Sequence, residues 1–419
     1  MCIKWYHIVI FVPLIIICGI IIWHKQSQIE AEGKIKVGII YSLTGPSAIY
    51  EKNIVDTTLM AIEEINEAGG VLAKKIVPII ADAKSDPDIF AQESERLIAQ
   101  EDVVALFAGG VSATTRKVKD ILEKYNSILF YPHSDEGLES SSNIIYNGPT
   151  SNQQIIPALI WCLQNLGQNF YLVGNKVKGP ALIRELAFRQ IIRDVVFAYD
   201  GRIVGEVFIS PQSRDIEDVI KMIDKAQPDV IINNLNGEVN RDFFRALRSH
   251  GISSEKIPTM SFNVTEVELA AFDINEMVGD YATQSYFQSL NTPANKIFLE
   301  KFKDRFGPER IISSSMENAY SSVFFWHIAA LKAKSTDTTA VLKQLSEQTF
   351  SAPEGIISID KTNLRTWKPV LIGKIFPSKQ FGIVWDSFST TMPMPIPPFR
   401  SKEQWEHLIN KWHTELEGK

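Results

Sequence analysis

An apolar strand that leads through a short polar loop into an amphipathic helix recurs along this chain. In the first instance, the apolar residues 35–41 run into a polar loop at 42–45. The helix that follows has one apolar face, formed by Val55, Leu59, Ile62 and Ile65. A second instance begins at residues 170–174 and continues through Asn175 to a helix from about residue 179. This repetition predicts α/β lobes in which polar loops at the strand ends line a crevice.

The alternation of strand and helix patterns continues through most of the chain. Further strands are expected at 76–80, 103–107, 128–131, 203–209, 230–233 and 258–263. This order predicts two doubly wound parallel-sheet lobes, each a mostly parallel sheet with helices on both faces. A strand at 278–287 is expected to return the chain to the first lobe, and another crossing is expected near 353–355. A short amphipathic helix is predicted at 401–416, after a proline-rich tail.

Length, composition and net charge indicate what kind of molecule the protein binds. A chain of 419 residues is too long for one ordinary core and suits two lobes. Its 45% hydrophobic and 22% charged residues are typical of a globular protein. The formal net charge of -6, with no stretch that combines Lys and Arg with interleaved aromatics, argues against a nucleic-acid partner. We therefore expect a small-molecule ligand.

The N-terminal segment 8–23 contains no charged residue, which predicts export or membrane attachment. Three interpretations are open: a cleaved signal peptide, a lipoprotein signal acylated at Cys18, and an uncleaved membrane anchor. A lipoprotein signal has a small residue before its cysteine, whereas Ile17 precedes Cys18, and no small-x-small cleavage site closes the apolar run. These features favour an anchor that holds a periplasmic domain. Cys162 is the single cysteine in the body of the chain, so no internal disulfide can form there.

Short motifs occur in a fixed order along residues 35–385. They are 63–72 (EEINEAGGVL), 130–132 with 136–139, 151–154 (SNQQ), 234–237 (NLNG), 286–289 with 292–293, 352–355 (APEG) and 366–369 (TWKP). Together they resemble the urea- and short-chain-amide-binding proteins of ABC transporters, within the leucine-binding-protein-like superfamily. The resemblance implies a type I periplasmic-binding-protein fold, in which two lobes joined by three crossovers close on a small solute. It also implies that the closed form is presented to a permease or a regulator.

The resemblance gives expected boundaries for each part of the chain. They are an N-terminal anchor or signal segment at 1–28, the first lobe at 29–153 and 285–350, the second lobe at 154–284 and 351–391, and a C-terminal tail with its helix at 392–419. Three loops depart from the family pattern, because Val111, Asp135 and Val177 stand where the family has aromatic rings. We therefore expect a ligand that is larger or more polar than urea, and not urea itself.

The candidate ligand-binding residues follow the ends of strands. They are Ser112, Ala113, Thr114, Tyr131, His133 and Asp135 in the first lobe, and Asn175, Lys176, Asn236 and Asn263 in the second. Ser112 and Thr114 begin a helix, where hydroxyl and backbone N–H groups could bind an anionic oxygen or only cap the helix. The carboxylate of Asp135 could pair with a ligand ammonium or amide N–H group, or it could only stabilise a turn.

No pattern in the sequence points to catalysis. The seven histidines are scattered without metal-ligand spacing, and neither a glycine-rich phosphate loop nor a Gly-x-Ser-x-Gly elbow occurs. We expect no enzyme activity, no cofactor and no metal. The favoured function is an extracytoplasmic protein that captures a small polar solute, such as an amide, a urea-like or an amino-acid-like molecule, for an ABC permease and ATPase. The alternative is a membrane-anchored sensing domain that regulates a signalling protein.

We predict that segment 8–23 is retained in the mature protein, because it lacks a convincing cleavage motif and has a poor lipoprotein signal. Intact-mass measurement on protein extracted from membranes should give the mass of the unprocessed chain. A mature chain that starts near Ala31, or one acylated at Cys18, would exclude the anchor.

Overall fold

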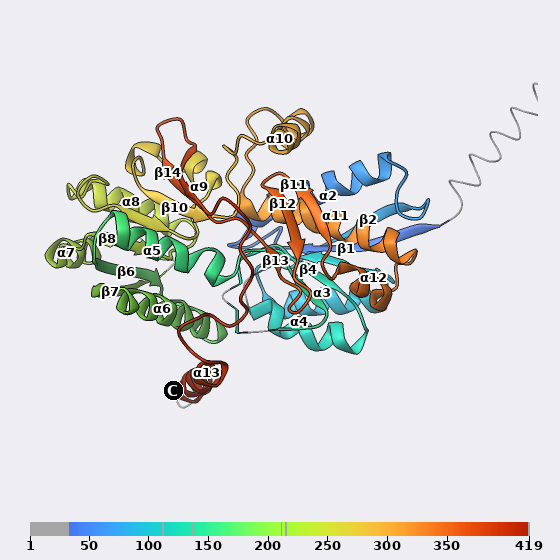
Figure 1. The fold of residues 1–419 in the computed structure, drawn as a ribbon, viewed down its shortest axis with the longest axis horizontal. Helices are drawn as coiled ribbons and strands as arrows, with labels where there is room; N and C mark the ends of the chain where they lie inside the picture. The colour runs from blue at the N-terminus through green and yellow to red at the C-terminus, as the bar shows by residue number, and fades with distance from the viewer. Residues whose placement is uncertain are drawn as a thin grey trace, which may run out of the picture.

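The chain folds into two α/β lobes that lie end to end, as Figure 1 shows. The computed structural model describes residues 33–110, 113–135, 137–138, 140–210, 212–213 and 216–417. The apolar segment 8–23 and Ser112 lie outside these ranges. Within them, no helix combines the length and the apolar character that a membrane span requires.

The first lobe is built on a parallel sheet with the strand order β2-β1-β3-β4-β5. Its strands are β1 (Lys34–Tyr41), β2 (Lys75–Asp82), β3 (Leu106–Ala108), β4 (Leu129–Tyr131) and β5 (Ile144–Tyr146). Pro78 lies in the edge strand β2, a position in a sheet where proline is tolerated. In the central strand β1, Val37, Ile39 and Ile40 are fully buried, because helices cover both faces of the sheet.

Two helical layers enclose this sheet. One contains α2 (Ala48–Glu67), α10 (Pro293–Phe306), α11 (Ser314–Ala333) and α12 (Thr338–Leu345), and the other contains α3 (Pro87–Ala99) and α4 (Ala113–Lys124). The helices α2 and α11 make the main contact of the first layer, although some 250 residues separate them in sequence. The first lobe is therefore completed by residues that follow the first part of the second lobe in the chain.

The second lobe has a mixed sheet with the order β15-β14-β10-β9-β8-β6-β7. The parallel strands are β6 (Asn169–Asn175), β7 (Arg202–Ile209), β8 (Val230–Asn233), β9 (Thr259–Ser261) and β10 (Tyr281–Gln284). The strands β14 (Leu371–Ile375) and β15 (Phe381–Asp386) are antiparallel, so the sheet is mostly parallel, as expected, with an antiparallel pair at one edge. A short turn joins β14 to β15, and short turns can join only antiparallel strands.

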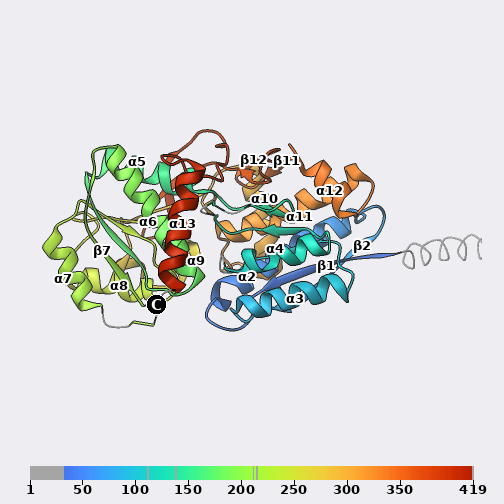
Figure 2. The ribbon, with the colours of Figure 1, turned by 90° about the horizontal axis from the view of Figure 1, so that it is seen from below.

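Helices again cover both faces of the second sheet. They are α5 (Ile155–Asn165) and α6 (Pro180–Ala198) on one face, and α7 (Glu217–Ala226), α8 (Val239–Ser249) and the short helices α9 (Glu266–Ala271) and η2 (Ile274–Glu276) on the other. The C-terminal helix α13 (Lys402–Glu417) packs outside α6, as Figure 2 shows from below, and its Trp405 is buried. The helix expected at 401–416 is therefore present.

A small antiparallel sheet follows α12 in the first lobe, so the third crossing comes later in the chain than the expected position near 353–355. It consists of β11 (Thr349–Ala352), β12 (Gly355–Ile359) and β13 (Thr366–Trp367). Ala352, Ile357 and Ile359 pack into the core of the first lobe. The turn at 353–354 therefore joins two strands of the same lobe, and the chain enters the second lobe only between β13 and β14.

Polar side chains tie the crossing segments to one another. Within the described residues, the chain passes between the lobes three times: after β5, after β10 and after β13. The short helix η1 (Ser151–Gln153) lies in the first of these segments. The side-chain amide of Gln153 donates to the carbonyl of Thr366 at 3.0 Å, and that of Gln154 donates to the carbonyl of Thr283 at 2.9 Å. The three crossing segments together form the hinge between the lobes, and these hydrogen bonds join them into one unit.

Lys368 forms a buried charged cluster beside this hinge. Its ammonium lies 2.5 Å from Glu354 Oε1, 2.6 Å from Asn318 Oδ1 and 3.6 Å from Glu317 Oε2, and its side chain has no exposed surface. Burial and the adjacent Glu354 carboxylate raise the pKa of Glu317 well above its usual value. The two carboxyl groups and one ammonium are therefore close to charge balance when Glu317 is protonated.

Candidate functional site

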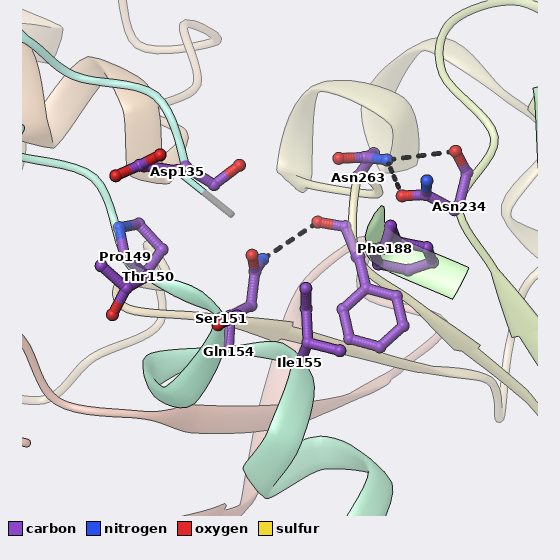
Figure 3. A pocket seen from close by; sticks show the side chains of 11 residues that line it. Asp135, Pro149, Thr150, Ser151, Gln154, Ile155, Phe188, Asn234 and Asn263 are labelled. Atoms are coloured by element: carbon purple, nitrogen blue, oxygen red, sulfur yellow. Dashed lines mark hydrogen bonds between the residues drawn. The ribbon is translucent and has the colours of Figure 1, made fainter. Parts of the chain in front are cut away.

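A pocket with about 280 Å³ of empty space, part of it open to solvent, lies where the two lobes meet. Its lining comes from the loop after β4, the first crossing, and the second lobe: Ser134, Asp135, Pro149, Thr150, Ser151, Gln154, Ile155, Phe188, Asn234, Phe262 and Asn263. In Figure 3, Asp135 and Asn263 stand on opposite sides of the pocket and Gln154 stands between them. A polar and apolar pocket between lobes is a common form of small-molecule site.

Asp135 lines the pocket, but its carboxylate already has partners within the protein. Its Oδ2 accepts a hydrogen bond from Arg365 Nε at 2.7 Å and forms an ion pair with Nη2 at 2.6 Å, and its Oδ1 accepts from the Gly137 N–H group at 2.9 Å. Arg365 directly precedes β13 and is fully buried, with its guanidinium 4.4 Å from the Tyr146 ring centre. The pair therefore fixes the loop after β4, so Asp135 has a structural role whether or not it also touches a ligand.

Tyr131 and His133 pack together at the end of β4. The Tyr131 hydroxyl donates to the Gly110 carbonyl at 3.0 Å, and the two rings meet edge to face with centres 5.4 Å apart. His133 Nδ1 lies 3.3 Å from Ser315 Oγ, while its Nε2 is buried without a hydrogen-bond partner among the described residues. Burial, and then the charge of Arg184 on α6 of the other lobe, lower the pKa of His133 to about 4.

The polar residues of the second lobe bind mainly to each other. Asn175 Nδ2 donates to the Asn234 carbonyl at 2.7 Å, and its Oδ1 accepts from the Asn236 N–H group at 3.2 Å. Asn263 Nδ2 donates to Asn234 Oδ1 at 2.9 Å, a contact drawn in Figure 3. These bonds join the ends of β6, β8 and β9, and they leave Asn263 facing the pocket.

The other predicted residues are spread more widely. Thr114 is buried in the first turn of α4, which begins at Ala113, whereas Ser112 lies outside the described residues. Lys176 and Asn236 are exposed. Of the ten candidates, Asp135 and Asn263 line the pocket. The sequence placed the others near strand ends, but it could not show which side chains are already bound within their own lobe.

Several pocket residues carried no functional signal in the sequence. Phe188 lies in the middle of α6 and reads as a core residue, although its side chain lines the pocket. Ser151 and Gln154 belonged to a motif, but no chemistry was assigned to them. The Ser151 hydroxyl is buried beside the pocket and lacks a hydrogen-bond partner within the described part of the chain. Asn234 was the detectable case, because it directly follows β8 and lies in the same loop as Asn236.

Residues 35–402 match the family described as periplasmic binding protein domain. The chain belongs to this family. The leucine-, isoleucine-, valine-, threonine- and alanine-binding protein of Pseudomonas aeruginosa is 24% identical over 360 residues, which is 79% of this chain and 87% of that protein. Two further curated relatives align with this chain over only 21% and 37% of their own lengths.

Solved structures of solute-binding proteins share the fold. A solute-binding protein of an ABC transporter from Rhodopseudomonas palustris, in complex with 3,4-dihydroxybenzoic acid, superposes with a TM-score of 0.76 at 18% identity, over 88% of this chain and 99% of that one. The branched-chain amino acid transporter substrate-binding protein LivJ of Streptococcus pneumoniae, in complex with isoleucine, gives 0.73 at 18% identity, over 86% and 100%. The chain therefore shares the fold of these two proteins, and the periplasmic binding protein family that its sequence matches is a non-enzymatic class.

We predict that Asp135→Ala lowers the free energy of unfolding by about 3–5 kcal/mol, because it removes the carboxylate that is paired with the buried Arg365 guanidinium. Urea unfolding followed by circular dichroism measures this loss. Lys361→Ala is the control, since it removes only the exposed pair with Glu347 and should cost less than about 1 kcal/mol. An unchanged unfolding midpoint in Asp135→Ala would contradict a structural role for the pair.

We also predict that His133 makes the protein less stable as the pH falls from 6.5 toward 4. Its pKa is lower in the folded protein than the usual 6.5, so the unfolded chain binds a proton first in this range. His133→Gln should flatten this part of the stability profile, as measured by unfolding at a series of pH values. His407→Gln, which changes an exposed histidine of α13, should keep the original profile. A His133→Gln profile with the same slope would contradict the burial of a neutral imidazole.

Proposed function

We propose that this protein captures a small carboxylic acid with an apolar body, an amino-acid-like or aromatic acid, and delivers it to an ABC importer. The observation that carries the proposal is the pocket between the lobes, whose lining combines groups of both lobes with those of the first crossing. A ligand held there would contact both lobes at once. It would therefore stabilise one lobe arrangement over others, which is how a binding protein signals occupancy.

The pocket lining supports a ligand that is partly apolar. Phe188 and Phe262 meet edge to face with ring centres 5.3 Å apart, and Ile155 lies beside them in the lining. On the polar side, the Ser151 hydroxyl has no hydrogen-bond partner among the described residues and can donate one hydrogen bond to a ligand oxygen. Burying a hydroxyl without a partner is unfavourable, so a ligand that supplies this bond is favoured. Urea has no apolar part to place against the rings, which agrees with the sequence departures at Val111, Asp135 and Val177.

The relatives support the same class of ligand. The Pseudomonas protein is named for binding leucine, isoleucine, valine, threonine and alanine, the Streptococcus protein holds isoleucine, and the Rhodopseudomonas protein holds an aromatic acid. The motif resemblance to urea- and amide-binding proteins suggests amides as a second class. We further propose that the protein works outside the cytoplasm, tethered to the membrane by segment 8–23. The sensing role remains the alternative, favoured by this tether and by the altered loops.

A thermal-shift screen tests the proposal. The panel is isoleucine, leucine, 4-hydroxybenzoate, 3,4-dihydroxybenzoate, acetamide and urea. We expect at least one of the four acids to stabilise the protein, by about 2.7 kcal/mol at a concentration of a hundred times its Kd, and urea to have no effect. Stabilisation by urea or acetamide alone would contradict the proposed ligand class.

Calorimetric titration of the stabilising acid then tests the pocket itself. Ser151→Ala should weaken binding by about 1–3 kcal/mol, because a ligand oxygen loses its buried donor. Ser253→Ala is a matched control at an exposed serine of the second lobe. Equal affinities for the two variants would place the ligand elsewhere in the cleft.

A further inference from the structure

The tail that follows β15 crosses the junction between the lobes before it forms α13. Residues 391–400 make up this crossing segment, which we call the strap. Figure 1 shows it in dark red, passing from the hinge region to α13 below α6. The tail was expected to be irregular and proline-rich, and nothing in the sequence indicated its path. Its contacts lie at the hinge, beside the pocket and on the outer surface of the second lobe.

The first end of the strap is fixed at the hinge. The Thr391 N–H group donates to the carbonyl of Lys368 at 2.8 Å, and Gln153 donates to the Thr391 carbonyl at 2.7 Å. Asn152 holds the next turn on both sides: its Nδ2 donates to the Met392 carbonyl at 2.8 Å, and its Oδ1 accepts from the Met394 N–H group at 2.9 Å. These contacts join the strap to the first and third crossings.

The middle of the strap lies against the loop that carries Asp135. The Leu138 N–H group donates to the Pro395 carbonyl at 2.8 Å. Gly137 permits this approach, because a Cβ atom there would come within 2.1 Å of the same carbonyl, and its φ of 85° favours glycine. Leu138 and Ile396 both pack against the apolar cluster formed by α5, α6 and Trp405. A first-lobe loop and the second lobe therefore meet at the strap.

The far end of the strap is fixed to the outside of the second lobe. Arg400 Nη2 donates to Asp194 Oδ1 of α6 at 2.7 Å, and Arg400 Nε donates to the other oxygen of the same carboxylate. Trp405 is 1% exposed, and its indole N–H group donates to the Pro397 carbonyl at 3.0 Å. Because α6 also carries Phe188 in the pocket lining, the strap connects two elements that line the pocket from different lobes.

We propose that the strap limits how far the two lobes can open when no ligand is bound. Opening must separate the Asp135 loop from α6, and the strap holds a contact with each of them. A restricted opening keeps more of the ligand-free protein near the binding-competent arrangement, which lowers the cost of closure. The inference rests on the proposed function for its biological meaning, but the restriction itself is a property of the ligand-free chain.

The distance between the lobes tests the proposal without a ligand. Spin labels are placed at Lys52→Cys on α2 and Lys225→Cys on α7, both exposed positions, in full-length protein with Cys2→Ser and Cys18→Ser. Cys162 stays unlabelled, because burial raises the pKa of its thiol far above the usual range. Distances from pulsed electron resonance are compared with and without Arg400→Ala/Trp405→Ala. We expect that variant to shift the mean separation by more than about 2 Å, the size of a domain rearrangement, and to broaden the distribution.

Two further variants make the outcome decisive. Lys411→Ala/Glu415→Ala removes an exposed pair from the same helix and should leave the distances unchanged. Arg400→Gln keeps Trp405 and removes the ion pair between the strap and Asp194. It replaces the double variant if circular dichroism shows that the double variant does not fold. Unchanged distances in a folded Arg400→Ala/Trp405→Ala or Arg400→Gln variant would overturn the proposal. Faster hydrogen exchange at the Leu138 amide would not rescue it, because that reports only on the local contact with Pro395. The result does not depend on which solute binds, so it can fail or succeed separately from the proposed function.

Discussion

The buried ammonium of Lys368 is the constraint around which the two lobes are joined. A charge with no exposed surface must be compensated locally, and Glu354, Glu317 and Asn318 supply that compensation from two separate segments of the first lobe. Lys368 itself stands on the third crossing, two residues after Thr366, which binds Gln153 of the first crossing. Moving the third crossing would therefore expose or unpair this charge. The hinge keeps its position because the alternative is a buried, uncompensated ion.

The pocket depends on this fixed hinge indirectly, through the residues next to the third crossing. Arg365 precedes the same crossing and holds Asp135 through a buried ion pair, so the hinge also positions the loop after β4. On the other side, the amides of Asn175 and Asn263 hold the strand ends of the second lobe together around Asn234. Each wall of the pocket is thus rigid within its own lobe. A ligand has to adjust only the separation of two preformed walls, and this lowers the ordering cost of binding.

The tail adds a third connection of a different kind. The crossings join the lobes through the covalent chain close to the hinge axis, whereas the strap reaches the outer surface of α6 through Arg400 and Trp405. A contact farther from the axis resists rotation more strongly than one at the axis. The position of the strap, and not the number of its hydrogen bonds, is therefore what gives it leverage over lobe opening.

The sequence by itself determined the features that depend on local pattern. Alternating apolar and polar positions placed most helices and the strands of both lobes. Short strands such as β5 and the hairpin β14–β15 were missed, since three to six residues give too little pattern. The site was only partly predictable: the sequence showed that Asp135 follows a strand, but its partner Arg365 stands 230 residues later. Which polar groups are already satisfied, and which face a ligand, is decided by contacts between distant segments, and only the tertiary structure brings these together.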